Sequence, residues 1–309
     1  MKTTMNFSME ASDLSRYTDC TDLRRFYQSF GLSGLELMPL GEDPGHLVEK
    51  DMIVGVHLRC VTDWMDLDKH MLLEHYRKDL EYARQMQAEY VVFHVTQVGF
   101  AESLVYKMKH TDAEVVDAAA AFINELLDGQ DYPFWFLMEN LWWPGLNMLD
   151  AKITERLLAQ VQYPKKGIML DTGHFMNSNI YLQTPTDALR YLHQMLDAHE
   201  ALLPMIRGIH LNQSLSGDYM RDYLKHPLTP KSDPEELATQ TFLHIFQVDQ
   251  HRPFTAPGVR ELVSRIDPDY VTLEYITRSR EEHAQFLKAG TDALKPIATI
   301  RDLAARSLI

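Results

Sequence analysis

Cysteine is scarce in this chain: Cys20 and Cys60 are the two cysteines in 309 residues. Two are too few for a disulfide framework, so a reducing, cytoplasmic location is expected. The N-terminal sequence MKTTMNFSME lacks the apolar core and small-residue cleavage site of a signal peptide. No stretch offers the ~18 uninterrupted apolar residues that a membrane helix needs. We therefore expect no association with a membrane.

Positive charge is also in short supply. The chain has 30 Lys and Arg against 44 Asp and Glu, a formal net charge of −14, which gives no general attraction to nucleic acid or to anionic membranes. The glycine-rich phosphate loops G-x-G-x-x-G and G-x-x-x-x-G-K-S/T are absent as well. Histidine, in contrast, is plentiful at 14 residues, and imidazole is the commonest metal ligand.

Short apolar runs bounded by turn residues predict eight β-strands. They are Met5–Ser8, Gly34–Leu37, Ile53–His57, Tyr90–His94, Phe134–Glu139, Gly167–Asp171, Ile206–His210 and Tyr270–Glu274. Amphipathic segments with helical spacing lie between most of them: Thr21–Phe30, Lys69–Gln87, Asp112–Leu127, Ala151–Val161, Pro185–Leu202 and Gly258–Arg265, followed by a C-terminal helix over Ser279–Ser307. This alternation, with strands apolar on both faces, predicts an α/β fold: a single (β/α)8 TIM barrel with parallel strands. A doubly wound open sheet is the alternative.

Six of the eight predicted strands end on a side chain that can bind a metal ion. These residues are His57, His94, Glu139, Asp171, His210 and Glu274. In a parallel barrel all strand ends meet at one rim, where such barrels place their active sites. Each residue alone is better explained as structural, but six buried together without a cation would carry a large desolvation cost. The pattern therefore predicts a metal centre.

Two further segments add candidate ligands. In the segment GIMLDTGH, Asp171 ends a strand and His174 follows three residues later. The pair could cap a helix and lie on the surface, or bind metal through carboxylate and imidazole. Asp249 and His251 form a D-x-H pair that could point at one ion from an extended loop, or lie in a polar surface loop.

The order of these motifs resembles the xylose isomerase-like barrels, a group that also contains the endonuclease IV type of abasic-site nuclease. The resemblance runs from the first strand to Glu274 and includes E-N at Glu139, D-T-x-H at Asp171 and H-x-N-x-S at His210. For the nuclease branch it implies three zinc ions. Their ligands would be His57, His94 and Glu139 for the first; Glu139, Asp171, His210 and Glu274 for the second; and His174, Asp249 and His251 for the third.

For the sugar isomerases and ketose epimerases of the same group, the resemblance implies one divalent ion. Its ligands would be Glu139, Asp171, His210 and Glu274, with the two glutamates acting as an acid–base pair and His174 contacting the substrate. One to three ions per chain are thus expected, with zinc or manganese ahead of magnesium or cobalt.

Departures from the nuclease pattern favour a small substrate over nucleic acid. The loop Met38–His46 carries two acids and no Lys or Arg, whereas phosphate clamping needs positive charge. Trp142 and Trp143 follow Glu139 and could line a sugar pocket, pack in the core or stack on bases. Residues 215–248 form an insertion after strand 7, which could be a lid, a subunit contact or a surface insertion.

We therefore expect residues 1–309 to form one domain that acts as a divalent-metal-dependent isomerase or epimerase on a small sugar or sugar phosphate. Glu139 and Glu274 would move the proton. The substrate-binding residues would be His174, Trp142, Trp143, Arg59 and Arg207, although Arg207 could equally be a salt-bridged barrel residue. The alternative function is a multinuclear zinc phosphodiesterase of the abasic-site endonuclease type. A lyase or dehydratase, or a non-enzymatic binding barrel, is a further alternative, and a homo-oligomer is a generic expectation.

Overall fold

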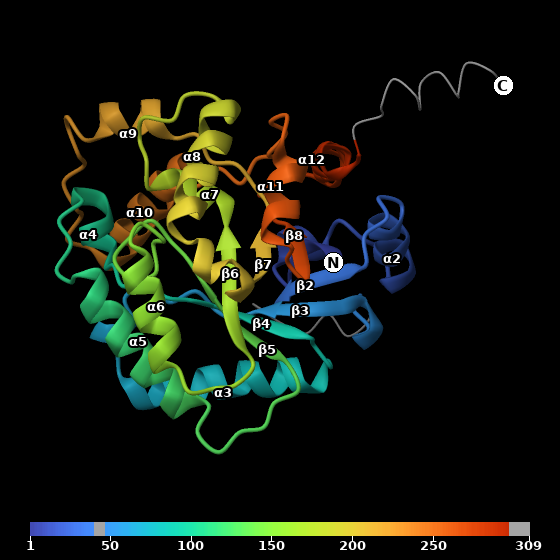
Figure 1. The fold of residues 1–309 in the computed structure, drawn as a ribbon, viewed down its shortest axis with the longest axis horizontal. Helices are drawn as coiled ribbons and strands as arrows, with labels where there is room; N and C mark the ends of the chain where they lie inside the picture. The colour runs from blue at the N-terminus through green and yellow to red at the C-terminus, as the bar shows by residue number, and fades with distance from the viewer. Residues whose placement is uncertain (40–46, 297–309) are drawn as a thin grey trace.

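The computed structural model describes residues 1–39 and 47–296, and its strands close into one barrel (Figure 1). The strands follow one another around the barrel in sequence order, and every neighbouring pair is parallel. They are β1 (Lys2–Ser8), β2 (Gly34–Met38), β3 (Ile53–His57), β4 (Tyr90–His94), β5 (Trp135–Glu139), β6 (Lys166–Asp171), β7 (Ile206–His210) and β8 (Tyr270–Leu273). The predicted (β/α)8 barrel is confirmed, and the alternative of an open sheet is excluded.

Closure of the barrel explains the largest difference from the predicted strand bounds. β1 begins at Lys2 rather than Met5, because Lys2 to Met5 pair with β8, from Tyr270 to Leu273. Glu274, which the sequence predicts as the last residue of strand 8, follows β8 directly.

Helices surround the strands, and the longer ones agree with the amphipathic segments of the sequence. They are α1 (Ala11–Leu14), α2 (Cys20–Gln28), α3 (Lys69–Gln85), α4 (Phe100–Val105), α5 (Asp112–Leu126), α6 (Ala151–Gln160), α7 (Thr172–Asn177), α8 (Pro185–Ala198), α9 (Gly217–Tyr223), α10 (Pro234–Val248), α11 (Val259–Ile266) and α12 (Arg280–Leu294), with 3-10 turns η1 (Lys50–Met52), η2 (Trp64–Asp66) and η3 (Glu200–Met205). Capping side chains mark several starts: Thr184, for example, accepts a hydrogen bond from the backbone N–H of Asp187 and begins α8. Residues 297–307 of the predicted C-terminal helix lie outside the described residues.

The barrel interior holds a small apolar layer beneath the strand ends. Its side chains are Val54, Tyr90, Val92, Leu137, Met169 and Tyr270. Tyr90 lies across the interior where Gly55 leaves room for it, since a Cβ on Gly55 would lie 2.1 Å from the Tyr90 ring. The phenol then reaches Glu36 on β2, with its oxygen 2.7 Å from Glu36 Oε2. An apolar layer therefore lies beneath the polar rim.

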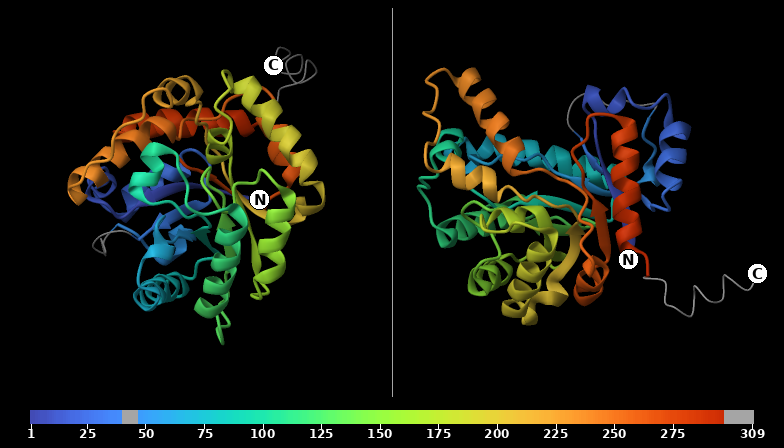
Figure 2. Two further views of the ribbon diagram at one scale, coloured as in Figure 1. Left: turned by 90° about the vertical axis from the view of Figure 1, so that its left-hand side faces the viewer. Right: turned by 90° about the horizontal axis from the view of Figure 1, so that it is seen from above.

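The predicted insertion, residues 215–248, contains α9 and α10. α10 packs on α4, where the rings of Phe242 and Phe100 meet edge to face with centroids 5.8 Å apart. Figure 2 shows α9 and α10 in orange tones beside α4 at one end of the molecule. The loops that follow β4 and β7 are therefore packed together on one side of the rim.

None of the described helices is long and apolar enough to cross a membrane. Residues 40–46 of the predicted acidic loop Met38–His46 lie outside the described residues.

Candidate metal centre

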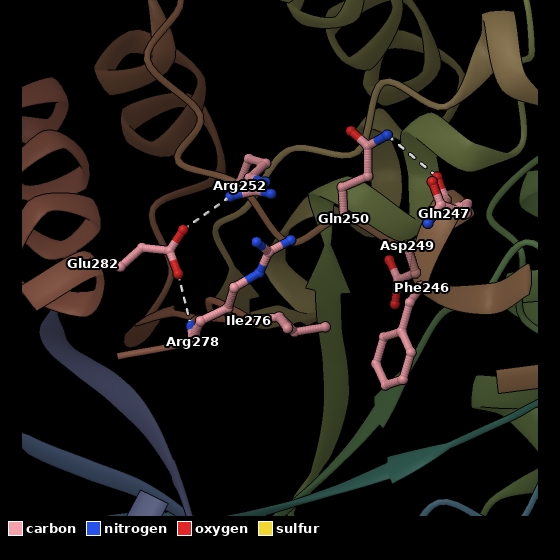
Figure 3. A pocket seen from close by; sticks show the side chains of 8 residues that line it. All are labelled: Phe246, Gln247, Asp249, Gln250, Arg252, Ile276, Arg278 and Glu282. Atoms are coloured by element: carbon pink, nitrogen blue, oxygen red, sulfur yellow. Dashed lines mark hydrogen bonds and ion pairs between the residues drawn. The ribbon is translucent and has the colours of Figure 1, made fainter. Parts of the chain in front are cut away.

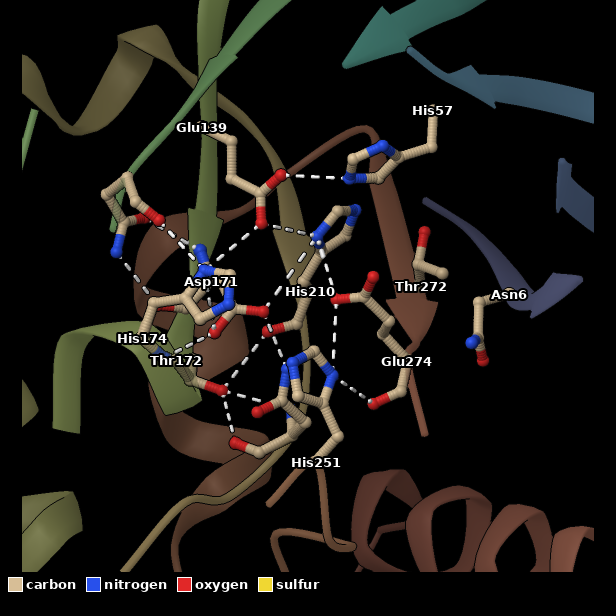
Figure 4. Close-up of polar contacts among 12 residues, drawn as sticks. Asn6, His57, Glu139, Asp171, Thr172, His174, His210, His251, Thr272 and Glu274 are labelled. Carbon is tan, nitrogen blue, oxygen red and sulfur yellow. Dashed lines mark hydrogen bonds and ion pairs between the residues drawn. The ribbon is translucent and has the colours of Figure 1, made fainter. Parts of the chain in front are cut away.

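Strand register brings the predicted ligands to one place. His94 on β4 is paired with Glu139 on β5, and Asp171 on β6 is paired with His210 on β7. Glu139, Asp171 and His210 are 0% exposed, and Glu274 is 8% exposed. Figure 4 shows their polar atoms converging at the carboxyl ends of the strands. The barrel thus buries several carboxylates and imidazoles within one cluster.

Glu139 lies at the centre of this cluster. Its Oε2 lies 3.1 Å from Nε2 of His57 and 3.0 Å from Nε2 of His94. Its Oε1 lies 3.1 Å from Nδ1 of His210 and 3.3 Å from Nδ1 of His174. The carboxylate therefore faces two groups of imidazoles at once, which is the position a bridging ligand would occupy.

Asp171, in the segment GIMLDTGH, both caps a helix and lies among the candidate metal ligands. Its Oδ1 accepts a hydrogen bond from the backbone N–H of His174 at 2.6 Å and so begins α7. Its Oδ2 accepts a hydrogen bond from Nδ2 of Asn212 at 2.6 Å and lies 3.9 Å from Nδ1 of His210. The helix cap and the candidate ligand are the same carboxylate, and the cap holds His174 at the rim.

The D-x-H pair also reaches the rim. Oδ2 of Asp249 lies 2.8 Å from Nε2 of His251 and 3.2 Å from Nε2 of His174. His251 adopts a positive φ of 44°, a left-handed conformation that costs energy in a residue other than glycine. This backbone turn accompanies a ring that lies over Glu274, with Nδ1 3.6 Å from Glu274 Oε2.

Four groups of side chains among the described residues have ligand atoms within 4.8 Å of one another. They are His57, His94 and Glu139; Glu139, Asp171, His210 and Glu274; Asp171, His174 and His251; and Glu36, His57, His210 and Glu274. The first two coincide with sets that the resemblance implies. The third contains Asp171 where the resemblance implies Asp249, although Asp249 contacts both histidines of that group.

Glu36 in the fourth group is a residue that sequence reasoning missed. It is 1% exposed on β2, and its carboxylate lies 2.9 Å from Nε2 of His210, on the side of the ring opposite Glu139. It also accepts hydrogen bonds from the hydroxyls of Tyr90 and Thr272, at 2.7 and 2.8 Å. A charged residue in the middle of the predicted strand Gly34–Leu37 was the available signal, because a buried carboxylate needs partners.

Burial sets the direction of the pKa shift for one residue of the cluster, and neighbouring charges outweigh burial for two others. Burial raises the pKa of Asp171 to about 6. Burial acts in the same direction on Glu139, but the nearby His94 and His210 outweigh it and hold the pKa of Glu139 well below its usual value. Burial favours the neutral form of His251, yet Asp249 and Glu274 outweigh it and raise the pKa of His251 to about 9.

The donor set fits a divalent cation. Glu274 Oε2 is buried and accepts no hydrogen bond from a described residue, although His210 Nδ1 lies 3.1 Å away. Carboxylate oxygens and imidazole nitrogens together suit zinc, manganese and similar ions. Such an ion would satisfy Glu274 and neutralise the carboxylates that surround it.

The two predicted cationic contacts do not join the centre. Arg59 follows β3, but its guanidinium forms a two-point ion pair with Asp79 of α3, with N–O distances of 2.7 and 2.6 Å. Arg207 lies near the start of β7, away from the strand ends, and pairs with Asp269 at 2.8 Å. Both guanidiniums already have a carboxylate partner. The expectation that they bind an anionic group is therefore not supported by their positions.

The two tryptophans differ from one another. Trp143 is 3% exposed and packs with Val98 and Leu141 in a small apolar cluster. Trp142 is half-buried, and its ring centroid lies 5.4 Å from that of His174. Trp143 is thus core packing at the rim, whereas Trp142 is beside the candidate ligands.

The structure is a closed parallel barrel with a carboxylate–histidine cluster at its rim that could hold a metal ion. The chain belongs to the xylose isomerase-like TIM barrel family, whose model matches residues 25–297. This match confirms the resemblance that the motif order predicts. No significant match is found among curated proteins.

Solved structures of several activities share the fold. Endonuclease IV from Thermus thermophilus is 16% identical, with 95% of this chain and 99% of that chain covered and a TM-score of 0.57. The IOLI protein with a bound zinc atom is 14% identical, with coverage of 95% and 98% and a TM-score of 0.56. An L-ribulose 3-epimerase is 11% identical, with coverage of 98% and 96% and a TM-score of 0.55. At these identities the likeness concerns the fold, and the activity has to be argued from the site.

Proposed function

We propose that this protein is a divalent-metal-dependent isomerase or epimerase that acts on a small sugar or sugar phosphate. The observation that supports this most is the pairing of Glu139 and Glu274, each with one oxygen 3.1 Å from Nδ1 of His210. Two glutamates on one ligand set are suited to removing a proton from one face of a substrate carbon and returning it on the same or the other face.

A pocket of suitable size supports a small substrate. A cavity of about 500 Å³ opens beside Asp249, which is within the range of small-molecule sites. The half-buried Trp142 offers an apolar ring face beside His174, which suits the C–H face of a sugar.

The roles of the side chains follow from their positions. A bound divalent ion would polarise a carbonyl or hydroxyl of the substrate and acidify the neighbouring C–H. Glu139, Asp171, His210 and Glu274 would hold the ion, and the two glutamates would also carry the proton at their carboxylate oxygens. His174, whose Nδ1 lies 2.9 Å from the backbone carbonyl of Asn140, has its ring orientation fixed for contact with the substrate. His57 and His94 would orient Glu139 through its Oε2.

The test is proton exchange. Protein loaded in turn with zinc, manganese, cobalt or magnesium is incubated with ketoses and their phosphates in D2O, and deuterium uptake at carbon is followed by NMR. A substrate that exchanges identifies the reaction. Glu139→Gln and Glu274→Gln are each expected to lower its rate by about 10²–10⁴-fold.

The control is His244→Gln, which alters a buried histidine on α10 outside the candidate ligand set and should retain the rate. Full turnover by Glu139→Gln on the identified substrate would overturn the proposal.

The second candidate function is a multinuclear zinc phosphodiesterase of the abasic-site endonuclease type. The ligand groups beyond the central four, at His57 with His94 and at His174 with His251, favour it. Two or three zinc ions per chain, measured by elemental analysis, together with cleavage of an abasic-site duplex, would support it. About one ion per chain and no cleavage across the same metals would count against it.

The expected location is the cytoplasm, because Cys20 and Cys60 are both free thiols and free thiols persist in a reducing compartment.

A further inference from the structure

The pocket beside the metal centre is lined by two arginines and two carboxylates. These side chains are Asp249, Arg252, Arg278 and Glu282 (Figure 3). The exposed side chains of Phe246 and Ile276 add apolar surface to the same wall. Asp249 belongs to the candidate ligand set and faces two histidines. Asp249 is therefore shared by the pocket wall and the candidate metal centre, and the two arginines belong to the same pocket wall.

Both arginines are carried by segments that also carry candidate ligands. Arg252 directly follows His251, and its backbone exchanges two hydrogen bonds with Gln213, at 2.9 and 2.7 Å. Arg278 follows Glu274 by four residues, and its backbone N–H donates to Oε2 of Glu282 at 2.7 Å. Hydrogen bonds therefore fix the backbone at each arginine, a few residues from a candidate ligand.

The carboxylates of the pocket do not neutralise both guanidiniums. Oε1 of Glu282 lies 3.5 Å from a terminal nitrogen of Arg252, at the long end for an ion pair. The guanidinium of Arg278 makes no ion pair with any residue in the described ranges 1–39 and 47–296. An unpaired guanidinium in a pocket is suited to an oxyanion, since its planar donors match phosphate and carboxylate groups.

Two of the arginines elsewhere on the barrel show the contrast. Arg59 has two short contacts with Asp79, and Arg207 is paired with Asp269. Neither is free to bind an anion. Arg278 differs from both because its charge faces the cavity without a carboxylate of its own.

We propose that Arg252 and Arg278 bind an oxyanion group, phosphate or carboxylate, on the small substrate that reacts at the metal centre. The inference rests on the proposed function and narrows its substrate class to sugars that carry a phosphate or carboxylate group. Since Asp249 lines the pocket and also contacts His174 and His251, a substrate of a few carbons that reacts at the metal centre would have its anionic end within reach of the arginines.

The experiment measures binding and needs no turnover. Glycerol 3-phosphate, glycerate and glycerol are titrated into the metal-loaded protein and followed by calorimetry. At least one of the two anions is expected to bind, with glycerol about tenfold weaker or undetectable. Because a charged hydrogen bond contributes about 10- to 100-fold in affinity, Arg278→Met and Arg252→Met should each weaken the anion by at least about tenfold.

Matched variants separate a local effect from a general one. Arg190→Met removes an exposed arginine of α8 that pairs with Asp187, and it should leave anion affinity unchanged. Arg278→Lys should retain part of the affinity, which keeps the test valid if the Met variant is unstable. Glu282→Gln removes the shared negative charge but keeps an acceptor for the Arg278 N–H, so it should tighten anion binding.

The two anions identify the source of the oxyanion. Preference for glycerol 3-phosphate supports a phosphorylated substrate, and preference for glycerate supports a sugar acid. Equal affinity of wild type and Arg278→Met for both anions would overturn the inference. So would arginine-dependent binding of an abasic duplex with no effect on the small anions. Failure of the D2O exchange screen leaves these binding results intact, so the two proposals can fail separately.

Discussion

Buried histidines in two regions of the protein have pKa values shifted in opposite directions. His210 at the rim is 0% exposed and lies among carboxylates, and its pKa is raised well above the usual value. His244 and His283 are 2% and 4% exposed. Burial lowers the pKa of His244 to about 4, and burial with the nearby Arg16 lowers that of His283 to about 3. Similar burial thus accompanies a raised imidazole pKa in one region and a lowered one in the other.

The surroundings explain the difference. Hydroxyls of Tyr106 and Tyr219 lie 3.0 and 2.8 Å from the two ring nitrogens of His244, and the ring of Tyr223 stacks on it. Such an environment favours the neutral imidazole. The rim holds four buried carboxylates, which positive charge nearby would stabilise: Glu36, Glu139, Asp171 and Glu274. The raised pKa values of His94, His174, His210 and His251 favour protons there as one source of this charge, and a bound cation would supply it while releasing those protons. The comparison therefore shows that the rim carries a set of groups that could hold a cation.

Metal removal should have the largest effect on this comparison. If the rim holds an ion at about 1,000 times its dissociation constant, chelation lowers the free energy of unfolding by about 4 kcal/mol. The measurement is denaturant unfolding with zinc or manganese and with a chelator. Glu139→Gln serves as the control and should respond much less to the chelator. Equal unfolding midpoints for the wild type in both conditions would contradict a stabilising ion.

Glu36→Gln should have the next largest effect. Glu36 contacts Nε2 of His210 while Nδ1 faces the candidate metal position, and such outer partners typically contribute 10–100-fold to metal affinity. Competition with a chromophoric chelator measures this affinity, and the absorption spectrum of the cobalt-loaded protein reports the ligand geometry. Tyr90→Phe, which removes one hydrogen bond to Glu36, should have a smaller effect. An unchanged affinity and spectrum in Glu36→Gln would restrict Glu36 to a structural role.

His283→Phe should have the smallest effect, and it tests a buried histidine whose pKa is lowered rather than raised. The folded-state pKa of His283 is about 3, below the value of about 6.5 expected in the unfolded chain. Above pH 6.5 both states are neutral and stability is full. As pH falls, the unfolded chain takes up a proton that the folded protein does not, so about 1 kcal/mol should be lost by pH 5.5.

The readout for His283 is the change in unfolding free energy between pH 7.5 and 5.5 in the metal-loaded protein. The decrease should be smaller by that amount in His283→Phe than in wild type. An identical decrease in both proteins would show that His283 does not stay neutral.

The sequence predicted the strand ends well and the side-chain partners poorly. His94 and Glu139 end apolar runs, and parallel strands must bring such ends to one rim, so their proximity follows from periodicity alone. The sequence did not predict Glu36 as a site residue, because it lies inside an apolar run. Only the pairing of strands in the closed barrel shows that it faces His210. The charges of Arg59 and Arg207 made them candidates for binding an anionic group. Their contacts with Asp79 and Asp269 depend on helix packing and strand pairing, which no local sequence pattern specifies.

The Gly55–Tyr90 contact in the barrel interior has a consequence for the rim above it. Because Gly55 has no side chain, the phenol of Tyr90 can lie across the interior, and its oxygen meets Glu36 from below. The hydrogen bond from Tyr90 thus helps to position the Glu36 carboxylate, which in turn contacts the imidazole of His210. Gly55, two residues before the candidate ligand His57 on β3, therefore affects the rim indirectly: a larger residue there would displace Tyr90 and, through it, Glu36 and His210.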